Sequence, residues 1–233
     1  MCYNSTISFT FFGLGLAASF YIYYFAHLIK KTGVYWLLLF YSLMELLQGV
    51  QYFYVNQCDM WMNRLLTEFA YVLVILQPFI WNLYFYVNSA FCEKPIFLVA
   101  LWLCICWIVV NLFARITYGV KNVEHQTKSH SVYASEKVCT KKKLSHLYWE
   151  WTSANFGDMN ANFLTYLLLW FIPALVSTQH WITSVVLICS ALVGAYMAYA
   201  AKEPFIFTSV WCYISVPIVL LVILQSFGLK RLI

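Results

Sequence analysis

Long apolar stretches follow one another along almost the whole chain, and they constrain its fold more than any other feature. A helix needs roughly 17–25 mostly apolar residues to cross the hydrocarbon core of a bilayer. Seven stretches approach or exceed that length, at residues 5–29, 34–56, 62–88, 96–118, 160–178, 181–201 and 205–229. The sequence therefore predicts an all-α membrane protein with seven transmembrane helices.

The composition excludes a water-soluble alternative. Of the 233 residues, 63% are hydrophobic and 10% are charged, whereas soluble domains carry about 45–50% apolar and about 25% charged residues. A chain this short cannot bury so many apolar side chains in a protein core. Lipid must cover much of the surface, so the lipid bilayer is the first partner that we expect.

The connections between the stretches are short, except for a basic segment from Lys121 to about Leu144. Short connections favour antiparallel packing of neighbouring helices. We therefore expect one domain over residues 1–233, an antiparallel bundle with a long basic loop between the fourth and fifth helices. The amphipathic segment 146–151 follows this loop, and we expect it to form a helical turn at the membrane interface or to lead into the fifth helix.

Two charge signals disagree about which side of the membrane holds the N-terminus. Lys30 and Lys31 follow the first helix and no basic residue precedes it, which places the N-terminus on the non-cytosolic side. Over all loops, however, nine Lys and Arg residues fall on the N-terminal face and five on the other, which favours the opposite orientation.

Cysteine placement favours the non-cytosolic N-terminus. Cys2, Cys58 and Cys139 all fall on the N-terminal face of the expected bundle. A disulfide there requires an oxidising compartment. Pairing of Cys58 with Cys139 would tie the loop after the second helix to the long basic loop, and Cys2 is an alternative partner.

Few polar groups lie inside the expected helices. An ionisable side chain near the centre of a membrane helix costs about 2.5–3.5 kcal/mol on insertion scales, so it suggests a function. Glu45 lies near the middle of the second expected helix, and Gln48 follows one turn later. Gln77 lies at the corresponding depth of the third helix. We therefore predict a midplane polar site formed by Glu45, Gln48 and Gln77.

Gln51, Glu68 and Asn82 would connect this site to the membrane surface. Pro78 also leaves a backbone carbonyl one turn earlier without its helical donor, and this carbonyl can bind a side chain, a water or an ion. Amide side chains in membrane bundles often serve only as hydrogen-bonding links between helices. For the four amide side chains, a structural role is therefore an equal alternative. They are Gln48, Gln51, Gln77 and Asn82.

Enzymatic activity has little support. His146 and Glu150 have a spacing that could share a metal on a helix, but no third ligand lies nearby. The expected seventh helix lacks the lysine that a retinal Schiff base needs. Most of the net charge of +5 sits in one loop, so we expect no nucleic-acid partner. We also expect no metal and no cofactor.

Several short motifs stand in a distinctive order along the chain. They are Met1-Cys2 with Ser8 and Phe11, Met44-Glu45 with Gln48, Gln51-Tyr52, Cys58 with Asn63, Gln77-Pro78, Trp149-Glu150-Trp151 and Pro173. Their order resembles an uncharacterised seven-helix family of large DNA viruses and unicellular eukaryotes. In that family the glutamate and glutamine of the second helix can occur in the opposite order. The resemblance implies the seven-helix architecture and a polar face on the second helix, formed by Glu45, Gln48 and Gln51. It does not suggest a particular activity.

Two functional hypotheses follow. The first is a small transporter or channel-like protein that moves an ion or a small solute through the midplane polar site, with a water-accessible cavity between the second and third helices. The second is a receptor-like or structural membrane module whose polar cluster is dry and fully hydrogen-bonded, and whose basic loop binds a partner or lipid. A homo-oligomer is compatible with both.

Overall fold

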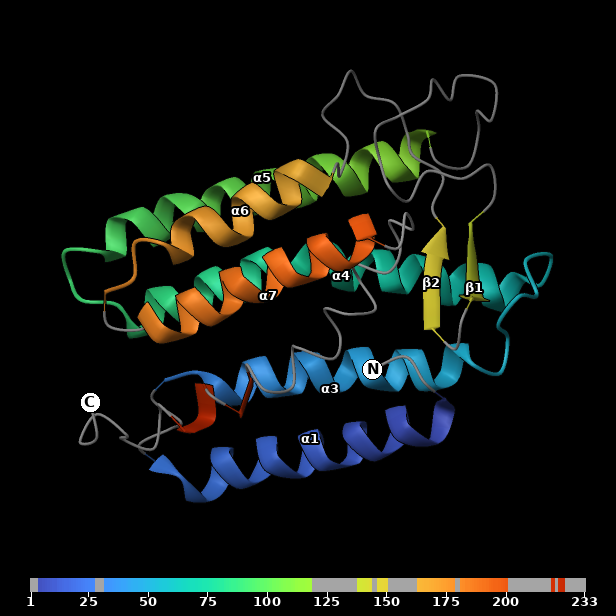
Figure 1. Ribbon diagram of the computed structural model, residues 1–233, viewed down its shortest axis with the longest axis horizontal. Helices are drawn as coiled ribbons and strands as arrows, with labels where there is room; N and C mark the ends of the chain where they lie inside the picture. The colour runs from blue at the N-terminus through green and yellow to red at the C-terminus, as the bar shows by residue number, and fades with distance from the viewer. Residues whose placement is uncertain are drawn as a thin grey trace.

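The computed structural model describes residues 4–27, 32–118, 138–143, 146–150, 163–178, 181–200, 219–220 and 222–224. Its longer helices are α1 (Ser5–Phe25), α3 (Val34–Gln51), α4 (Trp61–Asn88), α5 (Lys94–Tyr118), α6 (Phe163–Ala174) and α7 (Trp181–Ala200). Its strands are β1 (Cys139–Lys143) and β2 (His146–Glu150). Figure 1 shows the helices packed side by side, with the β1–β2 hairpin at one end of α4.

Three of the described helices are long and apolar enough to cross a membrane, namely α1, α4 and the segment Lys94–Phe113 of α5. Shorter apolar helices cover Thr165–Ala174 and Trp181–Met197. The chain is thus mostly helical and has the features of a membrane protein. Most of the expected seventh helix, residues 205–229, lies outside the described residues.

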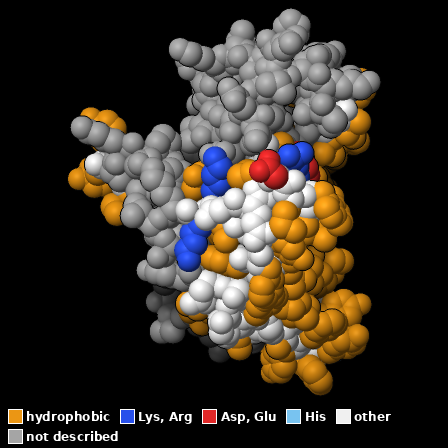
Figure 2. All heavy atoms as spheres, turned by 90° about the vertical axis from the view of Figure 1, so that its right-hand side faces the viewer, with side chains coloured by type: hydrophobic (Ala, Val, Ile, Leu, Met, Phe, Trp, Pro, Cys, Tyr) orange, Lys and Arg blue, Asp and Glu red, His pale blue; other side chains and the backbone are white. Residues whose placement is uncertain are grey.

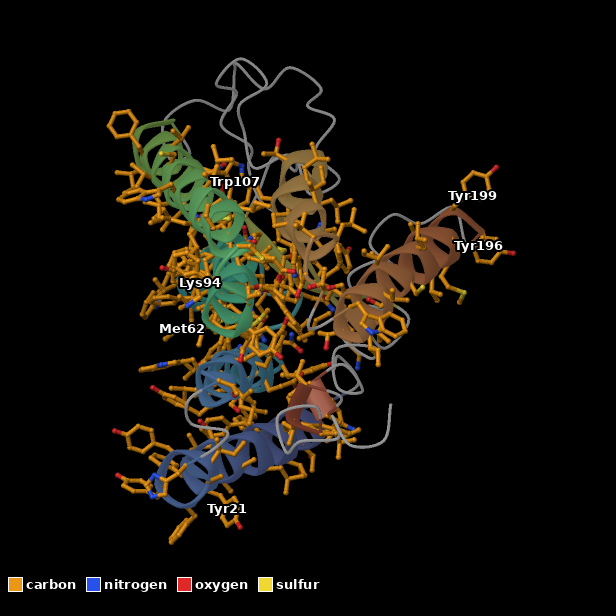
Figure 3. All side chains as sticks on the ribbon, turned by 90° about the vertical axis from the view of Figure 1, so that its left-hand side faces the viewer. Tyr21, Met62, Lys94, Trp107, Tyr196 and Tyr199 are labelled. Carbon is orange, nitrogen blue, oxygen red and sulfur yellow. A yellow bond between two sulfur atoms is a disulfide. The ribbon has the colours of Figure 1, made fainter. Side chains whose placement is uncertain are left out.

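Aromatic and aliphatic side chains cover the outside of these helices. Tyr196 and Tyr199 of α7 are 69% and 84% exposed, and Figure 3 shows both pointing away from the other helices. Tyr21 of α1 is 59% exposed. Exposed apolar side chains of this size are costly in water and favourable in contact with lipid. The outer surface therefore fits a bilayer environment.

Three expected helices end earlier in the structure than the hydrophobic pattern indicates. The first ends at Phe25 instead of residue 29. The second ends at Gln51 instead of residue 56, and residues 52–56 form turns that lead towards α4. In these turns Asn56 has a φ of 63°, a left-handed conformation that asparagine adopts more readily than most residues. The fifth ends at Ala174 instead of residue 178, one residue after Pro173, which cannot donate a helical hydrogen bond.

Small residues bring α1 and α3 into close contact. A Cβ atom added to Gly15 would lie 2.3 Å from Ser42 Oγ. Ser19 Oγ donates a hydrogen bond to the Tyr35 carbonyl at 2.9 Å, which joins the two helices directly. Contacts of this kind replace the hydrophobic driving force that is missing between helices in lipid.

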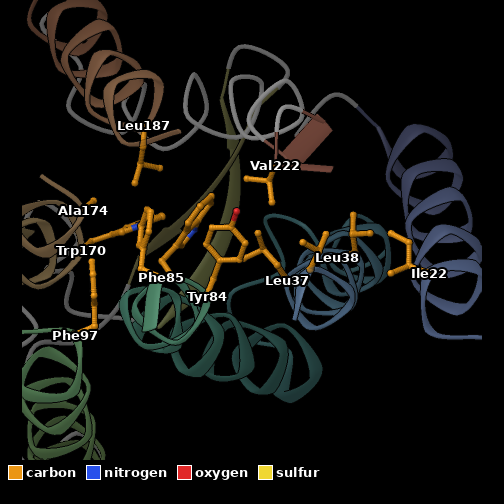
Figure 4. Close-up of a cluster of buried hydrophobic side chains, with 12 residues drawn as sticks. Ile22, Leu37, Leu38, Tyr84, Phe85, Phe97, Trp170, Ala174, Leu187 and Val222 are labelled. Atoms are coloured by element: carbon orange, nitrogen blue, oxygen red, sulfur yellow. The ribbon is translucent and has the colours of Figure 1, made fainter. Parts of the chain in front are cut away.

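One apolar core joins the described helices. Its large buried members include Leu37 of α3, Phe85 of α4, Phe97 of α5, Trp170 of α6 and Leu187 of α7, and Figure 4 shows these side chains meeting. Phe85 and Phe97 stack with their ring centroids 5.6 Å apart. Interdigitated side chains of this kind fix the helices relative to one another.

The segment after the basic loop is a strand, so the expected helical turn over 146–151 is wrong. β2 pairs antiparallel with β1, and Thr140 lies opposite Trp149. Leu147 and Trp149 are both buried, with exposures of 2% and 5%. This alternation has the period of a strand, and so short an amphipathic pattern cannot distinguish a helix from a strand. The backbone of β1 supplies the partners that make the strand stable.

Candidate functional site

Gln77, from the expected midplane site, is a hydrogen-bonded link between three helices. Its side chain is 6% exposed. Gln77 Nε2 lies 3.1 Å from Met44 Sδ of α3, and Gln77 Oε1 accepts a hydrogen bond from the Tyr166 hydroxyl of α6. Gln48 is also buried, at 2% exposure. Glu45 is half-buried on α3, and its Oε2 atom is shielded from solvent.

Asn82 holds α4 against α6, which differs from its expected position on an access route. Asn82 Nδ2 donates to the Leu169 carbonyl and to the Pro78 carbonyl, both at 2.8 Å. Leu169 lies four residues before Pro173, so its carbonyl lacks the usual helical N–H donor. The Asn82 side chain supplies that missing donor. This contact explains how a proline is accommodated inside an apolar helix.

Gln51 attaches the hairpin to α3, which also differs from its expected place on an access route. Its Nε2 donates to the Leu66 carbonyl at 3.0 Å and to Thr140 Oγ1 at 3.1 Å. Its Oε1 accepts from Trp149 Nε1 at 3.0 Å. Gln51 is 1% exposed, and both ends of its amide are bound to protein atoms.

Asn63 and Thr67 of α4 hold β1 of the hairpin. Asn63 Oδ1 accepts from the backbone N–H of Thr140 at 2.9 Å, and Asn63 Nδ2 donates to the Thr140 carbonyl at 3.0 Å. The same Nδ2 donates to the Tyr54 carbonyl at 2.7 Å. The hydroxyls of Thr67 and Thr140 lie 2.7 Å apart. We call the set Gln51, Asn63, Thr67, Thr140 and Trp149 the hairpin anchor.

A disulfide joins the same two parts of the chain. Cys58, just before α4, is bonded to Cys139 at the start of β1, with the Cα atoms 5.1 Å apart. This is the pairing that the cysteine positions favour. Cys2, the alternative partner, lies outside the described residues. The hairpin is therefore attached to the helices by a covalent bond as well as by the hairpin anchor.

The lysine run Lys141-Lys142-Lys143 is part of strand β1 in this attached hairpin. Lys142 is exposed, and its backbone N–H donates to Asn56 Oδ1 at 2.9 Å. Lys142 Nζ lies 5.7 Å from the centroid of the Tyr52 ring, within the range of a cation–π contact. Figure 2 shows the hairpin end of the molecule, where the charged side chains in view lie close together beside a hydrophobic flank.

Reasoning from the sequence missed most of the hairpin anchor. Asn63 and Trp149 entered only as parts of the family motifs, and Thr67 and Thr140 were not singled out. The available signal was the placement of Asn63 and Thr67 one turn apart, close after Cys58. Glu68, expected on the access route, is half-buried on α4 directly after Thr67.

The structure contains a cleft away from the expected polar site. Its volume is about 280 Å³, and it lies between α3 and α4 with Gly33, Trp36, Leu83 and Val87 among its lining residues. Within the described residues, no group of three His, Cys, Asp or Glu side chains is placed to hold a metal ion. The side chains of His146 and Glu150 lie outside the described part of β2.

Comparisons with known proteins identify a family. No curated protein and no solved structure matches the chain. A family model matches residues 6–231, and its description is a family of unknown function (DUF5765). Because this match extends over nearly the whole sequence, the chain belongs to the family of unknown function DUF5765.

Proposed function

We propose that this chain is a receptor-like multi-pass membrane protein that uses the β1–β2 hairpin to bind an anionic ligand outside the membrane. The observation that carries the proposal is the double attachment of a lysine-bearing hairpin to α3 and α4, by the Cys58–Cys139 disulfide and by the hairpin anchor. A binding element that is already ordered avoids the entropy cost of ordering when the ligand arrives. A run of lysines favours a polyanion.

The proposal includes a membrane arrangement with seven crossings and a non-cytosolic N-terminus. α1 begins at the end of the bundle that carries the hairpin (Figure 1), so Ser5 and the disulfide lie at the same end. Structural disulfides persist in oxidising compartments and are rare in the cytosol. Cys58–Cys139 therefore supports a non-cytosolic position for the hairpin, where an external ligand can reach it.

The hydrogen bonding of the amides supports a receptor-like module over a transporter. Gln51, Gln77 and Asn82 all bind protein atoms on neighbouring elements. Amide groups engaged in this way link helices, and they have fewer free positions for a passing ion. These bonds to protein atoms support the second hypothesis, in which the amides hold the helices together.

Binding of heparin tests the proposal, because heparin is a polyanion of defined chemistry. Purified protein in nanodiscs of uncharged lipid is expected to bind heparin fragments with an affinity that falls as salt rises. Replacing Lys141, Lys142 and Lys143 with Gln should weaken binding about tenfold, since each ion pair between a lysine and the polyanion contributes roughly 0.2–1 kcal/mol. Affinity would be measured by calorimetry or by fluorescence anisotropy of labelled fragments.

The control for this experiment is Lys94→Gln. Lys94 begins α5 at the end of α4 opposite the hairpin, so its replacement should leave heparin affinity unchanged. Equal weakening by Lys94→Gln and Lys142→Gln would show attraction by net charge alone and would contradict a specific hairpin site. Absence of binding at low salt would also contradict it.

Transport is the second function that we propose, and the half-buried carboxyl group of Glu45 on α3, whose Oε2 atom is shielded from solvent, favours it. A transport role predicts proton or cation flux into proteoliposomes, abolished by Glu45→Gln and reduced by Glu68→Gln. Asp59→Asn is a matched control, because the Asp59 side chain is 90% exposed. Flux no greater than in empty liposomes, from protein that remains folded, would rule out ion transport and leave the receptor-like function.

A further inference from the structure

A buried carboxyl group joins two turns at the end of the bundle opposite the hairpin (Figure 1). Glu93 lies in the turn between α4 and α5 and is 7% exposed. Its Oε1 accepts hydrogen bonds from the Thr178 backbone N–H at 3.1 Å and from the Thr178 hydroxyl. Thr178 follows α6, so this one carboxyl group connects the α4–α5 turn to the segment that leads towards α7.

Three buried oxygen atoms around this contact have no hydrogen-bond partner among the described residues. They are Glu93 Oε2, Ser89 Oγ and Ser177 Oγ. Ser89 and Ser177 are 7% and 3% exposed. Ser177 directly precedes Thr178, and Ser89 directly precedes Ala90, whose carbonyl accepts the Glu93 N–H at 3.0 Å. All three oxygens therefore belong to residues in or next to the same contact.

The charge of Glu93 also lacks a protein counter-ion among the described side chains. Lys94 is adjacent in sequence, but its Nζ lies 5.7 Å from the centroid of the Tyr86 ring. A buried carboxylate is strongly unfavourable unless it is paired and its remaining lone pairs are bound. Two of its hydrogen bonds come from Thr178, and both reach the same oxygen. The other oxygen needs a partner from outside the described chain.

We propose that Glu93, Ser89 and Ser177 form a binding site for an alkali-metal cation. Hard cations prefer carboxylate and hydroxyl oxygens. One carboxylate neutralises one monovalent ion, which leaves the buried site uncharged. The ion would stabilise the α4–α5 turn against the α6–α7 connection, far from the hairpin. This site is independent of the heparin-binding proposal.

Thermal unfolding of the full chain in nanodiscs tests the cation site. The midpoint would be measured in chloride salts of sodium, potassium and the large cation N-methylglucamine at equal ionic strength. Sodium or potassium, at about 100 times its dissociation constant, should raise the midpoint by roughly 5–10 °C relative to N-methylglucamine. The comparison of the two salts identifies the preferred ion.

Variants of the site give the decisive comparison. Glu93→Gln should lose the dependence on the cation. Ser177→Ala keeps the carboxylate and should need about tenfold more cation for half of the effect, so it remains informative if Glu93→Gln does not fold. Asp59→Asn, at an exposed position, should respond like the original chain. Equal midpoints in all three salts would overturn the proposal and indicate a bound water. An equal cation response of Ser177→Ala and the original chain would overturn the proposed site, because the cation would then bind without Ser177.

Discussion

Replacing Cys58 with Ser is expected to lower the free energy of unfolding by about 2–4 kcal/mol. The disulfide links Cys58 and Cys139 across a sequence separation of 81 residues. Without the disulfide the unfolded chain gains conformational entropy, which stabilises it relative to the folded protein. This gain increases with the length of the loop that the disulfide closes. Denaturant unfolding of the detergent-solubilised protein, followed by tryptophan fluorescence, measures the change.

Matched cysteine variants identify the cause of that loss. Cys139→Ser and the double variant should be destabilised as much as Cys58→Ser, because each removes the same bond. Cys106 is an exposed free cysteine on α5, so Cys106→Ser should behave like the original chain. A double variant as stable as the original chain would mean that the hairpin anchor alone holds the hairpin.

Replacing Asn63 with Ala is expected to destabilise the protein by about 3 kcal/mol or more. Asn63 binds both backbone groups of Thr140 and the carbonyl of Tyr54. Asn63 is 1% exposed and Thr140 is 1% exposed, so these groups would be left buried without partners. Each such loss costs about 1–3 kcal/mol. The same unfolding experiment gives the value.

Thr67→Val is the control for Asn63→Ala, because it changes a neighbouring contact with little change of shape. It removes the bond between the Thr67 and Thr140 hydroxyls and leaves the backbone of β1 satisfied, so about 1 kcal/mol is expected. Asn63→Ala should also weaken heparin binding, because the released hairpin must then be ordered by the ligand. Equal stability of the two variants would contradict the assigned role of Asn63.

The hydrophobic pattern located several helices closely. α4 begins and ends within one residue of the expected 62–88, and α7 ends one residue before the expected 201. Length and apolar content are local properties, so one stretch of sequence contains the information. The pattern located the end of α3 less well, because residues 52–56 are apolar enough to continue a helix yet form turns towards α4.

The polar residues were located by sequence, but their partners were not. Asn82 was expected on an access route, yet its side chain donates to the Leu169 carbonyl, 87 residues away, which lacks a helical donor because of Pro173. Gln51 was expected on a route for solutes, and its partners are Thr140 and Trp149 of the hairpin. Helical periodicity indicates the face on which a side chain lies, and it carries no information about the element that packs there.

Local patterns were therefore sufficient for the membrane class, for the position of the long helices and for the pairing of Cys58 with Cys139 as the favoured choice. The β1–β2 hairpin, its attachment through Asn63 and the Glu93–Thr178 contact required the three-dimensional arrangement. Removing the apolar side chains of a helix from water is favourable whichever element packs against them. A strand or a buried polar group, in contrast, is stable only when a specific donor or acceptor from a distant part of the chain lies opposite it.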